Sequence, residues 1–264
     1  MQERRFGSEQ RRLRVWDVPA GKQAGPAGSG RAQPGGGPVF VVVHGWGGGS
    51  RLYRRLTREL APHGRVLVFD LPGLTDVPRP SEPMGIGGFA RVANGTLAEL
   101  GVDEPVLVGH SMGAQVVVEM VHQQPRLGGR VVLVAPVVPA SLRSLRAAAL
   151  TFMRNSLHER PGAAALSVLG YLSSGVRWPM RVLPSVLGYP VEQRIEALAG
   201  RLEVVRGERD VMCPQDWSEL LAARSSAEAR IHVVPGAAHQ VVVDDARAVA
   251  SAALRVAGIA GADS

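Results

Sequence analysis

A serine stands in a setting that can make it a nucleophile. Residues 109–113 read GHSMG, a G-x-S-x-G pentapeptide that follows the apolar stretch PVLV and opens the amphipathic stretch MGAQVVVEMVHQQ. A sharp strand-to-helix turn here would expose the Oγ of Ser111, and the glycines would let strand and helix approach closely. The helix N-terminus would also favour a developing oxyanion. The pattern predicts a nucleophile; a tight glycine turn with an incidental serine is the alternative.

A serine hydroxyl needs a base to take its proton, and the chain offers one downstream. Asp210 follows the apolar stretch LEVV in RGERDVMCP, and His239 follows IHVV in PGAAHQ. Both are expected in loops at the carboxyl ends of strands, on the sheet edge that also carries Ser111. We predict that His239 is the general base and that Asp210 orients it. Glu208 is the rival carboxylate, and its loop position favours it less.

A glycine-rich turn, HGWGGGS, follows another apolar stretch at residues 44–50. Such a turn lets backbone N–H groups point into a site, so we expect the N–H groups of Trp46 and Met112 to form an oxyanion hole. His44 is interpreted as a structural turn residue rather than a base. A phosphate-binding loop is the rival interpretation, but the turn lacks the lysine of a P-loop and the spacing of a dinucleotide-binding motif.

The elements that would position these residues alternate along the chain. Short apolar runs rich in β-branched residues are typical of strands buried on both faces of a parallel sheet. The runs lie at 39–43, 66–69, 106–108, 131–134, 202–205 and 231–234. Helical patterns with apolar residues three and four apart lie at 52–60, 89–100, 112–122 and 241–256. The alternation predicts an α/β fold, with a mostly parallel sheet between two layers of helices.

The N-terminal part of the chain departs from this pattern. Residues 1–38 are expected to hold an opening strand at 11–18 and then a flexible loop at 20–38, where Gly, Pro and Ala leave little to bury. The catalytic core is therefore expected to span residues 39–140 and 201–264.

A second interruption separates the two parts of the core. Residues 141–200 contain no clear strand and are cut by prolines, so we expect short helices that form an inserted lid. The expected helices lie at 142–153, 163–172 and 182–187. The insertion carries seven arginines against three acids. Its large side chains are candidates to line an apolar substrate pocket. They are Phe152, Met153, Tyr171, Trp178 and Tyr189.

Composition limits the remaining function classes. The 264 residues and 45% hydrophobic side chains are enough for one substantial core. The formal net charge is +7, but no nucleic-acid reader motif accompanies the basic residues, so a solvated surface is the preferred interpretation. The single cysteine, Cys213, excludes an internal disulfide and is interpreted as a small buried residue. No Cys/His spacing typical of a metal site occurs.

Neither membrane insertion nor secretion is indicated. The apolar runs are too short to span a bilayer, and the N-terminus MQERRFGSEQRR lacks the apolar stretch of a secretory signal. We expect a cytoplasmic protein with no integral membrane segment. The sequence does not indicate the oligomeric state.

Five stretches of the chain together resemble the α/β-hydrolase family. HGWGG is similar to the family's oxyanion turn, FDLPG to the loop after the following strand, GHSMG to its nucleophile elbow, GERD to its acid turn and GAAHQ to its histidine loop. The resemblance spans residues 39–245 and implies an eight-stranded core with a lid inserted after the sixth strand. Two features depart from it: LTDVPRPSEP replaces a small G-x-S turn after FDLPG, and the second strand, expected within 20–38, is not recognisable.

The expected reaction is acyl transfer to water through an acyl-enzyme, with no metal or organic cofactor. The aromatic side chains of the insertion favour a small to medium apolar ester, thioester or lactone as the substrate. A C–C bond hydrolase or a perhydrolase with the same triad is an alternative, because the fold does not choose between them. A non-hydrolytic ligand-binding or lyase-like protein belongs to a second class, and surface binding through the basic N-terminus and lid to a third.

Overall fold

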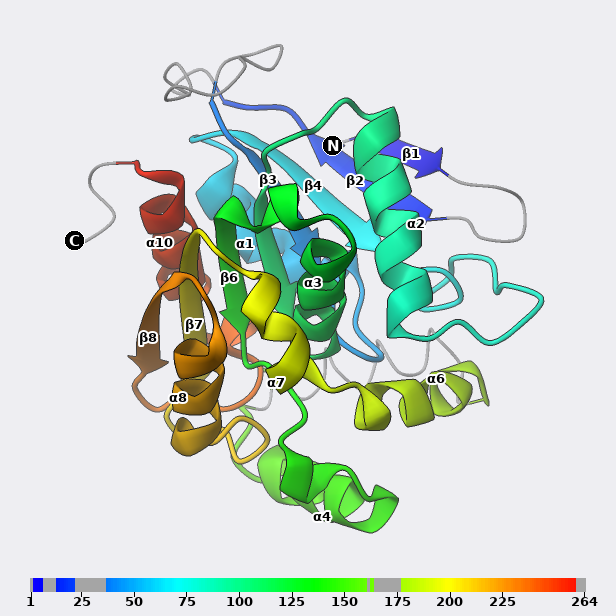
Figure 1. Cartoon of the computed structure of the whole chain (residues 1–264), viewed down its shortest axis with the longest axis vertical. Helices are drawn as coiled ribbons and strands as arrows, with labels where there is room; N and C mark the ends of the chain where they lie inside the picture. The colour runs from blue at the N-terminus through cyan, green and yellow to red at the C-terminus, as the bar shows by residue number, and fades with distance from the viewer. Residues whose placement is uncertain (1, 7–12, 22–36, 161, 164–176, 260–264) are drawn as a thin grey trace.

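The computed structural model is an α/β structure on one sheet, and it describes residues 2–6, 13–21, 37–160, 162–163 and 177–259 (Figure 1). The eight strands of the sheet lie in the order β1-β2-β4-β3-β5-β6-β7-β8. All pairs from β4 to β8 are parallel, whereas β2 is antiparallel to both of its neighbours. The strands are β1 (Gln2–Phe6), β2 (Leu13–Val18), β3 (Val39–Val43), β4 (Arg65–Asp70), β5 (Val106–His110), β6 (Arg130–Val134), β7 (Arg201–Gly207) and β8 (Glu228–Val234).

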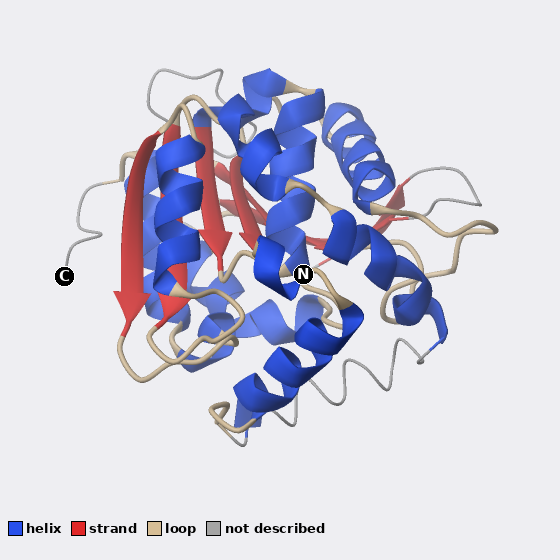
Figure 2. Ribbon diagram, turned by 60° about the horizontal axis from the view of Figure 1, so that its bottom comes forward, coloured by secondary structure: helices blue, strands red, loops and turns tan. Residues whose placement is uncertain are grey.

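Helices cover both faces of the sheet (Figure 2). One apolar cluster joins α2, α3, α7 and α8 to one face, and a second joins α1, α9 and α10 to the other. The α-helices described are α1 (Arg54–Leu60), α2 (Ile86–Glu99), α3 (Met112–Gln123), α4 (Leu145–Ser156), α6 (Arg177–Gly188), α7 (Val191–Arg194), α8 (Gln215–Arg224), α9 (Val241–Asp244) and α10 (Ala246–Ala257). Short 3-10 helices are η1 (Ser50–Tyr53), η2 (Pro125–Gly129), η3 (Ala140–Leu142) and η4 (Ile195–Ala197).

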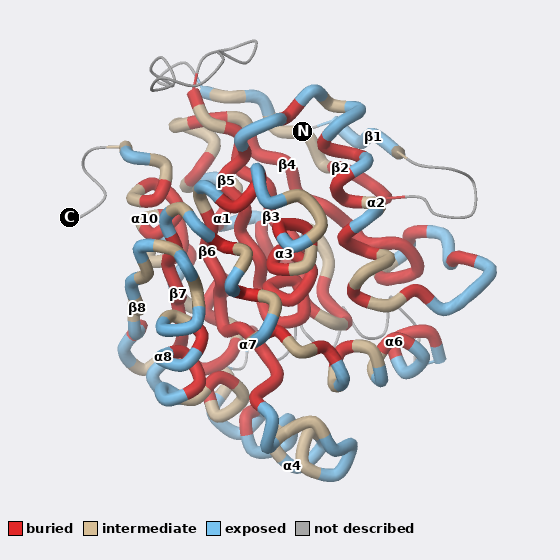
Figure 3. The backbone as a smooth tube through the Cα atoms, in the orientation of Figure 1, coloured by how far each residue is buried: buried red, intermediate tan, exposed pale blue. Residues whose placement is uncertain are grey.

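The fold class predicted from the sequence is confirmed. Each of the six predicted apolar strands is present, and the central strands β3 and β5 are buried along their whole length (Figure 3). Burial on both faces explains their continuous apolar sequences, because helices pack above and below them.

The described N-terminal strands are two. The strand expected at 11–18 is β2 at Leu13–Val18, and a strand that the sequence analysis did not predict, β1 at Gln2–Phe6, precedes it. Most of the expected loop, residues 22–36, lies outside the described residues. β1 reads QERRF and is exposed along most of its length at the sheet edge, so no apolar pattern marks it. Its antiparallel pairing with β2 defines it, with Arg5 opposite Arg14.

The helix expected at 241–256 is two helices. Asp245 separates them with a non-helical backbone, at φ −143° and ψ 77°. It is the N-cap of α10, and its side chain accepts a hydrogen bond from the N–H of Ala248 in the first turn of that helix. The side chain of the neighbouring Asp244, at the end of α9, is only 3% exposed. Apolar periodicity does not register such a break, because an N-cap aspartate interrupts the backbone without interrupting the spacing.

The loop after β4 is fixed by a buried arginine. Arg14 of β2 contacts the carboxylate of Asp70 at 2.7 Å and that of Asp76 at 2.5 Å. Asp70 also accepts the N–H of Ser50 at 2.7 Å, which ties the glycine-rich turn to the end of β4. In this chain the loop LTDVPRPSEP is thus anchored by the ion pair of Asp76 with Arg14.

Between β6 and β7 lie the helices α4, α6 and α7. The helix expected at 142–153 begins at Leu145, where Ser144 caps it, and that expected at 182–187 is part of α6. The helix expected at 163–172 lies almost wholly outside the described residues. The division into core and lid stays a prediction. Within the described ranges, no helix is both long enough and apolar enough to cross a bilayer.

Candidate active site

Ser111 occupies the tight turn between β5 and α3. Its backbone has φ 56° and ψ −121°, a strained conformation for a residue with a side chain. The flanking glycines are sterically required: a Cβ on Gly113 would collide with the carbonyl oxygen of Val43, and one on Gly109 with that of Gly113. The glycines thus let α3 leave the sheet at an angle that holds the serine at the strand end.

Two loops bring partners to this serine from distant parts of the chain. The hydroxyl of Ser111 lies 2.9 Å from Nε2 of His239, in the loop after β8. Nδ1 of the same ring lies 2.9 Å from Oδ2 of Asp210, in the loop after β7. A donated Nδ1–H to the carboxylate leaves Nε2 as an acceptor for the serine O–H. The structure therefore aligns the three side chains that the sequence singled out.

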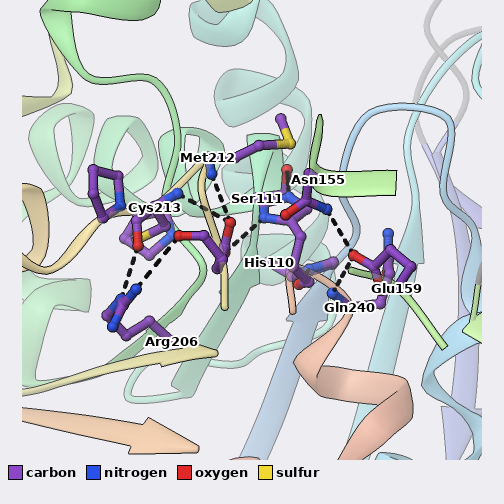
Figure 4. Close-up of polar contacts among 12 residues, drawn as sticks. His110, Ser111, Asn155, Glu159, Arg206, Met212, Cys213 and Gln240 are labelled. Atoms are coloured by element: carbon purple, nitrogen blue, oxygen red, sulfur yellow. Dashed lines mark hydrogen bonds and ion pairs between the residues drawn. The ribbon is translucent and has the colours of Figure 1, made fainter. Parts of the chain in front are cut away.

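The carboxylate of Asp210 is buried and held on its other side by backbone donors. Its Oδ1 accepts the N–H groups of Met212 at 2.8 Å and Cys213 at 3.1 Å, and Arg206 braces the same loop by donating to the carbonyl of Cys213 (Figure 4). Burial alone would raise the pKa of Asp210, but the charge and hydrogen bond of His239 and the two N–H donors outweigh it and hold the pKa below its ordinary value. The group stays ionised.

Opposing effects also act on the imidazole. Burial disfavours the charged form of His239, but the charge and hydrogen bond of Asp210, with a further contribution from Glu159, outweigh burial and raise its pKa. An imidazolium formed at this position is therefore stabilised by its surroundings.

The rival carboxylate lies elsewhere. Glu208 is exposed, and its Oε2 accepts the N–H of Gly236 at 2.8 Å in the turn after β8. The carboxylate of Glu208 thus stabilises this turn, and it does not contact the ring of His239. Of the two acids weighed from the sequence, Asp210 is the one in contact with the histidine.

The glycine-rich turn packs directly on the serine. A Cβ placed on Gly45 would lie 3.0 Å from Cβ of Ser111, so a larger residue here would push the turn away. Both predicted oxyanion donors, Trp46 and Met112, line the same cavity as Ser111. His44 is buried with both ring nitrogens used: Nδ1 donates to the carbonyl of Gly45, and Nε2 accepts the N–H of Leu71. These contacts agree with its interpretation as a structural residue.

A polar relay that the sequence analysis missed joins the three loops. The hydroxyl of Tyr53 accepts the N–H of Gly45 at 3.2 Å and donates to Nδ1 of His110 at 2.9 Å. Nε2 of His110 in turn donates to the carbonyl oxygen of His239 at 3.1 Å. Burial and the nearby His239 lower the pKa of His110 to about 3, so the ring is neutral. No local pattern connects Tyr53 to His110, since they lie 57 residues apart.

A cavity of about 450 Å³ opens beside the serine, and side chains of the insertion form one wall. Apolar residues of α4 and α6 line it, including Leu145, Ala148, Phe152, Met180 and Leu183. Phe152 was predicted to line such a pocket and does so. Within the described part of the chain, no cluster of three His, Cys, Asp or Glu residues could hold a metal ion.

The other candidate substrate residues lie outside the cavity lining or outside the description. Met153 is 66% exposed and is not among the residues that line the cavity. Trp178 is buried against Gly73 in the core, which its ring packs too closely to admit a Cβ. Tyr189 is buried and donates to the carboxylate of Glu119 at 2.9 Å. Tyr171 lies outside the described residues.

Comparisons with known proteins agree with this fold. A family model described as "Alpha/beta hydrolase family" matches residues 40–252. A 2-hydroxy-6-oxo-6-phenylhexa-2,4-dienoate hydrolase of Burkholderia cepacia is 35% identical over 106 residues, which cover 38% of this chain and 37% of that protein. A pimeloyl-[acyl-carrier protein] methyl ester esterase of Pectobacterium carotovorum is 27% identical over 184 residues, or 66% of this chain and 69% of that one.

The matches differ in how much of each protein they cover. The first curated relatives, from Mycobacterium species, match over 38% of this chain and 30% of their own length. An esterase from Thermogutta terrifontis superposes with a TM-score of 0.75 over 96% of both chains, at 18% sequence identity. At that identity the superposition shows a shared fold and nothing of the substrate.

Proposed function

Because this chain belongs to the α/β-hydrolase family, we propose that it is a serine hydrolase acting through Ser111, His239 and Asp210. One observation carries the proposal. The Ser111 hydroxyl, the imidazole and the Asp210 carboxylate form a buried line with two contacts of 2.9 Å, at the end of a strained strand-to-helix turn. Such an arrangement activates a hydroxyl that is otherwise a weak nucleophile.

The reaction divides into two acyl transfers. Ser111 Oγ attacks the substrate carbonyl while its proton moves to Nε2 of His239, and the imidazolium returns that proton to the leaving alcohol or thiol. A water molecule then attacks the acyl-enzyme, again losing its proton to His239, and the acid product leaves with Ser111 restored. Asp210 keeps its charge throughout, holding the tautomer and stabilising the imidazolium.

The tetrahedral intermediate carries a negative charge that needs donors. We assign its oxyanion to the N–H groups of Trp46 and Met112, because both residues line the cavity at Ser111. Met112 is the first residue of α3, so the partial positive charge of the helix N-terminus adds to its N–H.

The cavity supports an apolar acyl group. Its volume of about 450 Å³ and the side chains contributed by α4 and α6 suit an ester, thioester or lactone of small to medium size. Phe152 is assigned to this wall, and the insertion acts as the lid over it. Tyr171, whose position is outside the described residues, stays a prediction.

A C–C bond hydrolase is the second candidate. The B. cepacia relative, which matches 38% of this chain, is named for a substrate with an oxo group and no ester, and this supports a carbon–carbon bond beside a ketone as the alternative scissile bond. The same serine, histidine and aspartate would serve either bond.

A cytoplasmic location is also proposed, from the sequence alone.

Covalent labelling and turnover test the proposal together. A fluorophosphonate probe should label the wild-type protein at Ser111, and the Ser111→Ala variant should neither label nor hydrolyse a p-nitrophenyl ester. Failure of the wild type to label would refute the proposal and favour a non-hydrolytic binding protein, because an unactivated serine does not react. Profiling esters, thioesters, lactones and vinylogous ketones then separates the first candidate from the second.

A further inference from the structure

Glu159 of the insertion is hydrogen-bonded to the loop that carries His239. Glu159 follows α4, and its Oε1 accepts the backbone N–H of Gln240 at 3.2 Å and the side-chain N–H of Asn155 at 2.8 Å (Figure 4). Gln240 directly follows His239 in the chain. The carboxylate is therefore attached to the loop that carries the histidine, and it lines the same cavity as Ser111.

Among the described residues, the cationic partner on which the charge of Glu159 acts is the imidazole of His239. No arginine in the described ranges forms an ion pair with it. Two titratable groups face it, His239 and Asp244 of α9, while Arg160 pairs loosely with Asp244 at 3.9 Å and is mostly exposed. Burial raises the pKa of Glu159 above its ordinary value and Asp244 adds to this, while His239 and the hydrogen bonds from Asn155 and Gln240 offset part of the increase and favour the charged form.

Asn155 gives the carboxylate a fixed orientation. It is only 4% exposed, and its amide nitrogen donates to Glu159 from one helical turn earlier. Glu159 is partly buried, and two hydrogen-bond donors on one carboxylate oxygen restrict its orientation.

We propose that Glu159 is a positioning residue, which fastens the His239 loop to the insertion and supplies a second negative charge to the imidazolium. The inference rests on the proposed serine-hydrolase function and extends it. Asp210 contacts the imidazole of His239 directly, Glu159 is hydrogen-bonded to the next residue of the same loop and acts on the ring through its charge, and the neutral ring of His110 lies at a centroid distance of 5.4 Å.

This arrangement makes the base depend on the seating of the insertion. When α4 lies on the core, the carboxylate both holds Gln240 and favours the protonated histidine of the transition state. If α4 moves away, the loop loses its tether and the ring loses one of its two charges. A second contact, in which Nε1 of Trp46 donates to the carbonyl of Pro179 in α6 at 2.9 Å, links the insertion to the glycine-rich turn as well.

Two substitutions separate the charge from the tether. Glu159→Gln keeps an oxygen that can accept from Gln240 but removes the charge, whereas Glu159→Ala removes both. Glu196→Gln is the matched control, because it is the same chemical change in the same insertion. Glu196 is exposed in η4, which precedes the N-terminal end of β7, whereas Asp210 follows the C-terminal end of that strand. The measurement is the second-order rate constant for fluorophosphonate labelling of Ser111 as a function of pH.

The expected results differ in kind. Removing a negative charge lowers the pKa of His239, so in Glu159→Gln the acid limb moves to lower pH, and the plateau falls about threefold to tenfold. Glu159→Ala should show the same movement and lose roughly tenfold more, because the loop is no longer held. Glu196→Gln should overlay the wild type.

The contrary results are equally distinct. If the acid limb of the pH–rate profile of Glu159→Gln overlays that of Glu196→Gln, the proposed role of the charge is wrong. If the plateau rate constants of Glu159→Gln and Glu159→Ala are equal, the proposed role of the hydrogen bond to Gln240 is wrong. The Cε1–H NMR titration of His239, assigned with a His239→Gln variant, reads the pKa in unlabelled protein. It decides the charge role even if the wild type fails to label, which would refute the proposed function separately.

Discussion

Tyr53 donates its phenol hydrogen to Nδ1 of His110 at 2.9 Å, and this buried bond links the glycine-rich turn to the loop of the active-site histidine. The same hydroxyl accepts from Gly45, and His110 donates onward to the backbone of His239. One phenol hydroxyl thus connects the glycine-rich turn, through His110, to the backbone of His239.

Tyr53→Phe should weaken both the fold and the reaction. Removing the hydroxyl leaves Nδ1 of His110 and the N–H of Gly45 buried without partners, which costs about 1–3 kcal/mol of unfolding free energy and misplaces the two loops. Urea unfolding and ester turnover measure the two effects. Tyr189→Phe is the control, since it removes a buried hydroxyl bonded to Glu119 and should lower stability while leaving kcat near wild type. Equal kcat in the two variants would contradict the relay.

Asp210→Asn and Glu208→Gln should differ sharply. The first removes the charge that holds and stabilises the imidazole, and kcat/KM should fall roughly 10³- to 10⁴-fold. The second removes a charge from an exposed turn and should change kcat/KM by less than about twofold. Steady-state hydrolysis of a p-nitrophenyl ester checks both. A large loss in Glu208→Gln with a small loss in Asp210→Asn would reverse the assignment of the acid.

The pH dependence follows from the raised pKa of His239. The base must be neutral to accept a proton, so kcat/KM should rise with pH through a midpoint above the ordinary histidine value of 6.5. The sign for stability is opposite: a raised folded-state pKa stabilises the protein below the unfolded pKa, and this contribution is lost as pH rises through the folded value. Stopped-flow labelling gives the pH profile of the reaction, and chemical denaturation gives the pH profile of stability. A midpoint below pH 6.5 in the reaction profile would contradict the raised pKa of His239.

Gly113→Ala should disrupt the turn that carries Ser111. Its Cβ would collide with the carbonyl oxygen of Val43 in the centre of the sheet, so β3 or α3 must shift at a cost of about 3 kcal/mol or more. Gly95→Ala, in the middle of α2 with open space around it, is the same chemical change and should instead stabilise by about 0.5–1 kcal/mol. Thermal unfolding compares them. Equal melting temperatures would show that the turn tolerates a side chain.

Substitutions of the adjacent residues Phe152 and Met153 should affect substrate binding differently. Phe152 lines the cavity, so Phe152→Ala should raise KM for medium-length acyl esters several-fold by removing apolar contact. Met153 lies in solvent, and Met153→Ala should leave KM unchanged. A chain-length series of p-nitrophenyl esters is the measurement. A rise in KM for Met153→Ala that matches Phe152→Ala would place the acyl group elsewhere.

The sequence predicted the parts of the molecule that local rules encode. Continuous β-branched runs identified the buried strands, and helical spacing identified α2 and α3, since burial on two faces and on one stripe produces those two patterns. The position of Ser111, Asp210 and His239 after strands was enough to predict one common sheet edge. β1 escaped because an exposed edge strand needs no apolar residues, and the break at Asp245 because a cap leaves the spacing intact.

What only the tertiary structure decided are the contacts between residues distant in the chain. The choice of Asp210 over Glu208, the burial of Trp178 away from the cavity, the relay through Tyr53 and the approach of Glu159 to the His239 loop all depend on which loops meet. The physical reason is that periodicity reports whether a side chain is buried, whereas its hydrogen-bond partner is set by packing between elements that lie many tens of residues apart.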